Sequence, residues 1–297
     1  ARIMVGVNAT ATAAAAYYES LAYAQDRRQG RQLGARGGDM VPIIGHADVR
    51  RMLLRQKAII EGSLALLATV SRYWDVSEHG ASDEERERAR LLLDILTPVA
   101  KTFPAERGFE ANTLAIQIHG GYGYTSEYLP EAYMRDQKLN TLHEGTNGIQ
   151  SMDLLGRKVM ASGGASLRTL AEEMEATIAR AREIGCDEDL CRALEEAVAS
   201  VGAITMELGQ RGMSGDADGM LGHSWDYLDM FATLVIGWQW LNMAAAAQTA
   251  PLSDERKHAI DAATQYWIRT EIPRIPLLAN LCRTNEDSYI KAQPSWF

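Results

Sequence analysis

The feature that most constrains the fold of this sequence is a long stretch without proline: none of the chain's 8 prolines lies between Pro130 and Pro251. Proline breaks helices because it lacks an N–H donor and its ring clashes with the preceding turn. Alternation of β-branched residues over four or more positions is scarce, whereas apolar residues recur at helical spacing. The sequence therefore predicts an all-α protein made of long helices.

Three sets of apolar residues show this helical spacing, and each set is expected to line one buried face of its helix. They are Leu53, Ile60, Leu64 and Leu67 on a helix from about residue 46 to 75; Leu170, Met174 and Ile178; and Leu190, Leu194, Val198 and Val201. Residues 230–247 are apolar almost throughout, but Gln239 and Asn242 interrupt them and no basic residues flank them. A buried core helix is therefore favoured over a membrane span.

Two breaks rich in small residues organise the chain. They lie at residues 161–166 (ASGGAS) and 211–219 (RGMSGDADG), and Gly, Ser and Asp clusters of this kind mark turns. We therefore divide the chain at about residue 160, with a bundle of long helices in 1–160 and a helical extension in 161–297. The charged stretch 82–90 is expected to begin a further helix with Ser82 as its N-cap.

Composition excludes some classes of function. The chain carries 30 Lys and Arg against 39 Asp and Glu, a net charge of −9, and no dense basic tract, so it does not resemble a general nucleic-acid binder. Its three cysteines, Cys186, Cys191 and Cys282, are odd in number and lack zinc-type spacing. We therefore expect a reduced, cytoplasmic setting. The six histidines are scattered without a metal-ligand motif, so no metal site is expected.

Residues 117–157 differ from the rest of the chain. Gly120, Gly121 and Gly123 stand among tyrosines, in the run GGYGY. Glycine allows a positive φ or a close approach of backbone to a ligand, so the run is either a turn between helices or a ligand-approach site. It is not a dinucleotide-binding fingerprint, because no strand precedes it.

Two charged motifs each allow a structural and a functional interpretation. The sequence His143-Glu144-Gly145-Thr146 precedes an amphipathic segment, so Glu144 is either a helix-capping residue or a general base of tunable pKa. The basic cluster at residues 26–31 (DRRQGR) ends the first helix. Its arginines either complement the helix dipole or bind phosphate.

Three segments, in the same order and spacing, resemble the C-terminal helical domain of the acyl-CoA dehydrogenase family. They are VGVNATATAAAAYYESLAYAQDRRQG, QIHGGYGYTSEY with the MRD that follows, and HEGTNGIQ, in which Glu144 comes 27 residues after Gln117. The match runs from Arg2 to about residue 159. It implies that residues 1–160 form an up-and-down four-helix bundle. It also implies that the full-length protein is an FAD-dependent enzyme that dehydrogenates acyl-CoA thioesters, as in fatty acid β-oxidation.

The resemblance implies roles for three residues of the HEGT motif and for Arg2. Glu144 corresponds to the catalytic base that removes the α-proton of the acyl-CoA. Thr146 corresponds to a residue beside the base that touches the flavin. Gly145 and Arg2 correspond to positions near the substrate. In the family, the backbone N–H of the base and a flavin hydroxyl stabilise negative charge on the thioester oxygen, and the hydride from Cβ passes to the flavin.

The same resemblance implies cofactor contacts and partners. Arg27 corresponds to the arginine that contacts the FAD pyrophosphate, and Gln117, Gly120 and Gly121 to the loop that holds the ADP part of FAD. In the family these contacts cross a subunit interface. The expected partners are therefore an acyl-CoA substrate, an electron-transfer flavoprotein and other copies of the chain in a homodimer or homotetramer.

The sequence departs from the commonest family pattern in four places. They are Gln29-Gly30-Arg31 in place of Gln-Phe-Gly, His143 where a tyrosine often precedes the base, Gly148 in place of a longer polar residue, and the extension 161–297. These departures resemble the long-form branch that includes 3-(methylthio)propanoyl-CoA dehydrogenases. The tryptophans of the extension are expected to pack mainly in its core, and its role is expected to be bundle stabilisation and oligomer contacts.

Family members carry an N-terminal helical domain and a middle β-domain before this region, and neither is recognisable here. We therefore expect the sequence to be the C-terminal part of a longer protein, inactive by itself and weak in FAD binding. Two alternatives stay open. One is a helical assembly module that keeps the fold without catalysis, and the other is an acyl-CoA oxidase that passes electrons to O₂.

Overall fold

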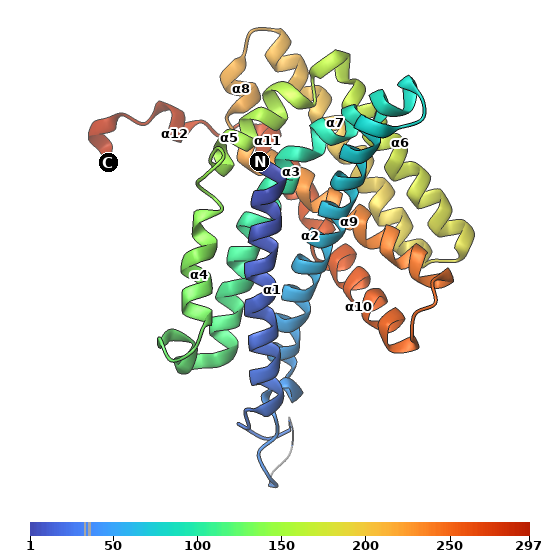
Figure 1. Ribbon diagram of the computed structural model, residues 1–297. Coiled ribbons are helices and arrows are strands. Elements are labelled where there is room, and N and C mark those ends of the chain that lie inside the picture. Colours follow the sequence, from blue (N-terminus) through green and yellow to red (C-terminus); the bar gives the residue numbers. More distant parts are fainter. Residues whose placement is uncertain (33, 35–36) are drawn as a thin grey trace. The chain divides into compact units, whose positions relative to one another are not determined.

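The computed structural model describes residues 1–32, 34 and 37–297, and within these residues it consists of helices and turns without a β-strand (Figure 1). The α-helices are α1 Arg2–Asp26, α2 Ala47–His79, α3 Asp83–His119, α4 Pro130–Leu139, α5 Asn147–Asp153, α6 Ala161–Ile184, α7 Glu188–Met213, α8 Ala217–Leu221, α9 Ser224–Thr249, α10 Asp254–Thr270, α11 Ile275–Thr284 and α12 Ser288–Lys291. Short 3₁₀ turns are η1 Ile43–Gly45, η2 Gly120–Tyr124, η4 Ile272–Arg274 and η5 Pro294–Trp296, and η3 Leu154–Lys158 is a π-helical turn. The all-α prediction is confirmed.

The described chain divides into two compact units. The first comprises residues 1–68 and 100–147, and the second comprises residues 69–99 and 148–297. The long helices α2 and α3 contribute to both units, so the units are not split at residue 160. The division into a bundle domain at 1–160 and a helical extension at 161–297 stays a prediction.

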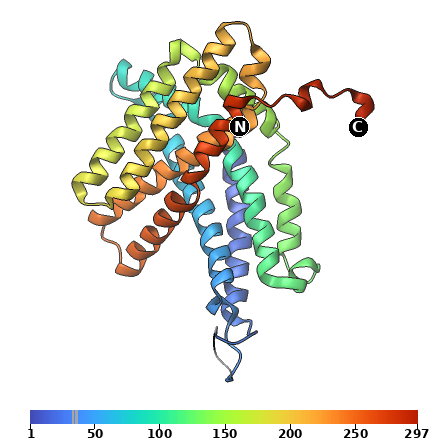
Figure 2. The ribbon, with the colours of Figure 1, turned by 180° about the vertical axis from the view of Figure 1, so that it is seen from behind.

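The first unit is an up-and-down bundle of α1, the first two thirds of α2, the last part of α3, and α4 (Figures 1 and 2). In its core the alanines of α1 and α3 pack against a larger side chain of α2: Ala13 of α1, Ile60 of α2 and Ala111 of α3 form one buried cluster. A buried hydrogen bond from Ser20 to Gln56, 3.3 Å, also joins α1 to α2. Because many side chains of α1 are alanines, the neighbouring helices α2 and α3 can pack close to its backbone.

One glycine of α1 is required by this close packing. A Cβ on Gly6 would lie 2.1 Å from the carbonyl oxygen of Ala100 in α3. Proline at position 104 has no N–H to donate to the carbonyl four residues earlier, which leaves the Ala100 oxygen without that intrahelical partner. The backbone of α1 packs directly against this carbonyl.

The second unit is organised around α9, which α6, α7, α10 and α11 contact. The side chains of Trp238, Trp240 and Trp267 are buried, whereas Trp225 and Trp296 are exposed. The helix α9 lies in an apolar segment long enough to cross a membrane, but 83% of its most apolar window is buried by the protein, as predicted for a core helix. Core packing is therefore confirmed for three of the five tryptophans of the extension.

The predicted apolar faces are largely buried, with two exceptions. Leu53, Ile60 and Leu67 are buried, but Leu64 is 52% exposed, so its assignment to the core is wrong. Val198 is only half-buried on α7. Helical spacing identifies residues that share a stripe, but it does not set how wide a stripe the neighbouring helices cover.

The predicted helix N-cap at Ser82 and the predicted break at residues 161–166 are both confirmed. Ser82 accepts a hydrogen bond from the Glu85 N–H, 3.1 Å, as the N-cap of α3. Ser162, Gly163 and Gly164 have positive φ values of 51°, 63° and 79°, which breaks the chain at the start of α6. The cysteines are unpaired thiols; Cys191 and Cys282 are buried and Cys186 is half-buried.

Candidate active site and nucleotide pocket

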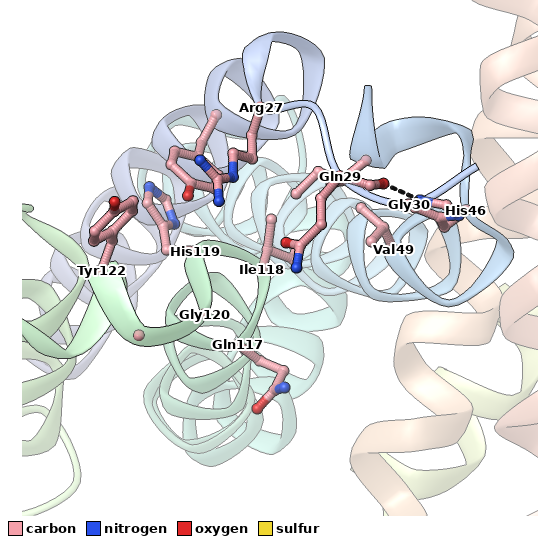
Figure 3. Close-up of a pocket in the computed structure, with 13 residues that line it drawn as sticks. Arg27, Gln29, Gly30, His46, Val49, Gln117, Ile118, His119, Gly120 and Tyr122 are labelled. Atoms are coloured by element: carbon pink, nitrogen blue, oxygen red, sulfur yellow. Dashed lines mark hydrogen bonds between the residues drawn. The ribbon is translucent and has the colours of Figure 1, made fainter. Parts of the chain in front are cut away.

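A pocket of about 560 Å³ opens in the first unit, where α1 ends, α2 begins and α3 passes into η2 (Figure 3). This volume is typical of a small-molecule site. The lining residues are Tyr23, Arg27, Gln29, Gly30, Ile43, His46, Val49, Gln117, Ile118, His119, Gly120, Gly121 and Tyr122. Four of the five residues that the resemblance assigned to FAD, namely Arg27, Gln117, Gly120 and Gly121, are among them, and Thr146 is not.

The three arginines that follow α1 have different roles. Arg28 donates to the Met40 carbonyl, 2.9 Å, and Arg31 donates to the Gly38 carbonyl, 2.9 Å, so both brace the loop after the helix. Arg27 instead lines the pocket, with its guanidinium carbon 5.7 Å from the centre of the Tyr122 ring. No carboxylate among the described residues pairs with Arg27, so its donor fork is available to an anion.

The glycines of the GGYGY run also divide into two kinds. A Cβ on Gly120 or Gly121 would have no atom within 4 Å, and Gly120 has a φ of 62°. A Cβ on Gly123 would instead lie 2.7 Å from the Ile116 carbonyl oxygen and 2.8 Å from the His119 Cβ. The turn between helices is therefore confirmed, with Gly123 at its close contact, and the ligand-approach interpretation stays a prediction for Gly120 and Gly121, which leave bare backbone on the pocket.

Aromatic rings form one wall of the pocket. The Tyr23 and His119 rings are stacked with centroids 4.3 Å apart, and the Tyr122 ring is stacked on Tyr128 at 5.5 Å. Burial raises the pKa of the Tyr23 phenol, and the nearby Arg27 guanidinium opposes this shift. In Figure 3 the side chain of Gln117 points away from Arg27, so Gln117 forms the rim of the pocket.

The sequence did not predict His46, which lines the side of the pocket opposite the aromatic rings. There, His46 Nε2 lies 2.7 Å from the Gln29 carbonyl oxygen, which fixes the imidazole beside Gly30 (Figure 3). A Cβ on Gly30 would be 3.2 Å from this ring. The departure Gln29-Gly30-Arg31 thus makes room for a ring brought from before α2, a pairing that no local pattern in the sequence signals.

The HEGT motif forms a tight loop between α4 and α5. Glu144 and Gly145 have positive φ values of 55° and 84°. Because Glu144 is not a glycine, this left-handed conformation is strained and requires support from the surrounding structure. Glu144 and Thr146 are exposed residues, and Gly145 is half-buried.

The HEGT loop and the pocket lie at opposite ends of α1. Asn8, near the start of α1, donates to Asn140, which immediately follows α4, over 3.1 Å. Arg27 follows the last residue of the same helix. At about 1.5 Å per residue, the 19 residues from Asn8 to Arg27 span roughly 28 Å. Arg2, at the start of α1 and half-buried, belongs to the HEGT end.

The predicted residues therefore form two groups. Arg27, Gln117, Gly120 and Gly121 meet in one pocket whose lining contains an arginine and two histidines but no carboxylate. A guanidinium fork, bare glycine backbone and aromatic faces fit the pyrophosphate and rings of a nucleotide. The other group contains Glu144, an exposed residue whose carboxylate is the candidate for proton transfer. Among the described residues, no cluster of three potential metal ligands was found.

Comparison with protein families agrees with this architecture. The model described as "Acyl-CoA dehydrogenase, C-terminal domain" matches residues 1–160, and that described as "Acetyl-CoA dehydrogenase C-terminal like" matches residues 170–293. The chain belongs to the acyl-CoA dehydrogenase family.

Individual relatives support the same family. The chain is 38% identical over 255 residues to a 3-methylmercaptopropionyl-CoA dehydrogenase of Ruegeria pomeroyi, an alignment that covers 85% of this chain and 43% of the relative. It is 42% identical over 172 residues to a butyryl-CoA dehydrogenase of Syntrophomonas wolfei, which covers 58% of this chain and 28% of the relative. The chain thus spans less than half the length of these relatives.

Solved structures share the fold. An acyl-CoA dehydrogenase of Bacillus anthracis complexed with FAD aligns with a TM-score of 0.75 at 18% identity, covering 95% of this chain and 48% of that one. The Caenorhabditis elegans protein ACDH-11 in complex with C11-CoA also gives 0.75, at 17% identity, covering 99% and 47%. At these identities the likeness establishes the fold alone.

Proposed function

We propose that this chain is the C-terminal part of an FAD-dependent acyl-CoA dehydrogenase in which Glu144 removes the α-proton of an acyl-CoA thioester. The observation that carries the proposal is the arrangement of the first unit, which belongs to this family. It holds the pocket lined by Arg27, Gly120 and Gly121 at one end of α1 and the exposed residue Glu144 at the other.

Glu144 has the properties that a general base requires. Glu144 is an exposed residue on a loop, and its left-handed backbone conformation is strained and must be supported by the surrounding structure. An α-proton is weakly acidic, so the base must be held within hydrogen-bond reach of it while negative charge on the thioester oxygen is stabilised. When bound, FAD supplies the acceptor for the hydride that leaves Cβ.

The proposal extends to the partners that the family resemblance implies. They are an acyl-CoA substrate, an electron-transfer flavoprotein as electron acceptor, and further copies of the chain in a homodimer or homotetramer. We place the protein in the cytoplasm. The assignments of Thr146 beside the flavin, and of Arg2 and Gly145 near the substrate, belong to the same proposal.

The pocket assignment predicts a selective effect of Arg27→Gln. In the full-length protein this substitution is expected to weaken FAD binding about 10- to 100-fold, because a hydrogen bond to a charged group contributes about 1.5–3 kcal/mol. Arg28→Gln is the matched control, since Arg28 braces the loop through the Met40 carbonyl. The dissociation constant of FAD is measured for each variant by flavin fluorescence. Equal affinities of the Arg27 variant and the wild type would remove Arg27 from the cofactor site.

An anaerobic experiment tests the function itself. The full-length protein, purified with its flavin, is mixed with a panel of acyl-CoA thioesters without oxygen, and flavin absorbance is followed. We expect bleaching with at least one thioester and formation of the 2-enoyl product. If no thioester bleaches the flavin, the proposed function is wrong. Admission of air then separates a dehydrogenase, which is reoxidised slowly, from an oxidase, which produces peroxide rapidly.

The oxidase remains the second candidate because the fold does not separate the two classes. An acyl-CoA oxidase of Yarrowia lipolytica aligns with a TM-score of 0.67 at 18% identity, covering 97% of this chain and 47% of that one.

A further inference from the structure

A lysine is buried completely in the first unit, although no part of the proposed reaction uses it. Lys101 lies on α3 with 0% of its surface exposed, in the otherwise uncharged run LTPVAKTFPA. Burial lowers the pKa of its ammonium to about 8, and the Glu106 carboxylate opposes this shift. A buried charge is costly unless it is hydrogen-bonded, so its partners indicate what it does.

The Lys101 ammonium donates to a residue at the end of the HEGT loop. Its Nζ lies 2.8 Å from Oδ1 of Asn147, the first residue of α5. The other end of this amide, Nδ2, donates to Oε2 of Glu106 over 3.1 Å. A cation on the amide oxygen and a carboxylate on the amide nitrogen match the polarity of the side chain, so the two residues of α3 hold Asn147 in one orientation.

Asn147 in turn closes the loop that carries Glu144. Its backbone N–H donates to the Thr141 carbonyl over 3.1 Å, so residues 141–147 form a closed turn. Asn147 is 4% exposed and lies three residues after Glu144, whose φ is 55°. The loop is also fixed at its start, through the hydrogen bond between Asn8 and Asn140. The strained segment is therefore held at both ends by buried or half-buried polar contacts.

We propose that Lys101 is a positioning residue for Glu144: together with Glu106 it clamps Asn147 and thereby holds the HEGT loop in the conformation that presents the base. This inference deepens the proposed function and rests on it. Lys101 does not touch the reacting atoms. It acts through Asn147, and the charge on its ammonium strengthens the hydrogen bond that fixes the loop.

The clamp has a consequence for pH dependence. The charged group that acts on Lys101 from its own helix is Glu106, and the residue that meets it from α5 is the neutral Asn147. As the pH rises through about 8, the ammonium loses its charge and becomes a weaker donor. We therefore expect kcat of the wild type to fall above this pH.

Lys101→Met tests the clamp in the full-length holoenzyme. Methionine matches the length of lysine and suits a buried apolar site, so the variant is expected to fold. We expect kcat to fall about 10- to 100-fold with little change in KM, because a small displacement of a catalytic group costs rate more than binding. The decline of kcat above pH about 8 should be absent. Lys138→Met, at an exposed lysine of α4, is the matched control.

Hydrogen–deuterium exchange of the same holoenzyme provides a readout that does not depend on turnover. Lys101→Met should speed exchange in peptides that cover residues 140–148 and leave α1 peptides unchanged. Asn147→Ala breaks the same clamp from the loop side and replaces Lys101→Met if that variant does not fold. The double variant should be no worse than the more impaired single one.

The outcomes separate the clamp from the proposed function. If Lys101→Met has the same kcat, pH profile and exchange rates as the wild type, the proposal that Lys101 holds the loop is wrong. Glu144→Gln, measured in parallel, should abolish turnover while leaving exchange at residues 140–148 slow. If Glu144→Gln turned over normally, the proposed function would fail, and the exchange data would still decide whether Lys101 holds the loop.

Discussion

Glu144→Gln in the full-length protein is expected to slow flavin reduction by an acyl-CoA about 10²- to 10⁴-fold, the usual contribution of a positioned general base. Glutamine keeps the size of the side chain and its hydrogen-bonding capacity but cannot accept a proton at neutral pH. Because Glu144 is exposed in this chain, the substitution should leave folding intact. Stopped-flow absorbance under single-turnover conditions gives the rate of reduction.

The control for this prediction is Glu127→Gln. Glu127 is also exposed and lies in the turn after η2, outside the lining of the pocket. It should reduce its flavin at the wild-type rate. A loss of rate in both variants would indicate a general effect of surface charge, and a normal rate in Glu144→Gln would show that another group is the base.

Trp267→Ala is expected to destabilise the second unit by about 3–5 kcal/mol, the range for removing a large aromatic side chain from a core. Trp267 of α10 is 0% exposed, and its indole Nε1 donates to the Thr233 carbonyl of α9 over 3.1 Å. The substitution therefore creates a cavity beside the central helix and leaves a buried carbonyl without this donor. Urea unfolding, followed by far-UV circular dichroism, measures the change in the free energy of unfolding.

Trp296→Ala is the matched control for the core prediction. Trp296 lies in η5 near the end of the chain and is 70% exposed. Its removal should change the free energy of unfolding by less than about 0.5 kcal/mol, as is usual for a surface substitution. Equal losses in the two variants would mean that the α9–α10 contact does not dominate the stability of this unit.

Local patterns in the sequence predicted much of the fold because they report on local physics. The Ser82 cap, the break at residues 161–166 and the burial of the 230–247 segment each follow from short-range chemistry. Leu64 shows the limit of periodicity. It shares a stripe with Ile60 and Leu67, yet it lies beyond the part of that stripe that the neighbouring helices cover.

Residues of the candidate site could be predicted only where they belong to a motif that resembles the family. Arg27, Gln117, Gly120 and Gly121 could be assigned together through the family resemblance, and the structure brings them into one pocket. His46 could not be assigned, because it reaches the pocket from the segment before α2. Contacts of this kind depend on how separate segments pack, and residue spacing does not encode them.

The sequence around Lys101 gave only a weak indication that this residue has a specific partner. A lone lysine in an otherwise uncharged, mainly apolar run is expected either to reach solvent or to have a specific buried partner. Its partner, Asn147, lies 46 residues further along the chain, beyond the range of any helical pattern. Only the packed unit reveals that the two residues meet.

The most direct test of the central claim, that Glu144 removes the α-proton, is isotope exchange at the substrate. The full-length protein with its flavin already reduced is incubated with an acyl-CoA in D₂O, so that net dehydrogenation is blocked, and deuterium at Cα is measured by mass spectrometry. The wild type should incorporate deuterium, and Glu144→Gln should slow incorporation about 10²-fold or more. Incorporation by Glu144→Gln at the wild-type rate would contradict the assignment of the base.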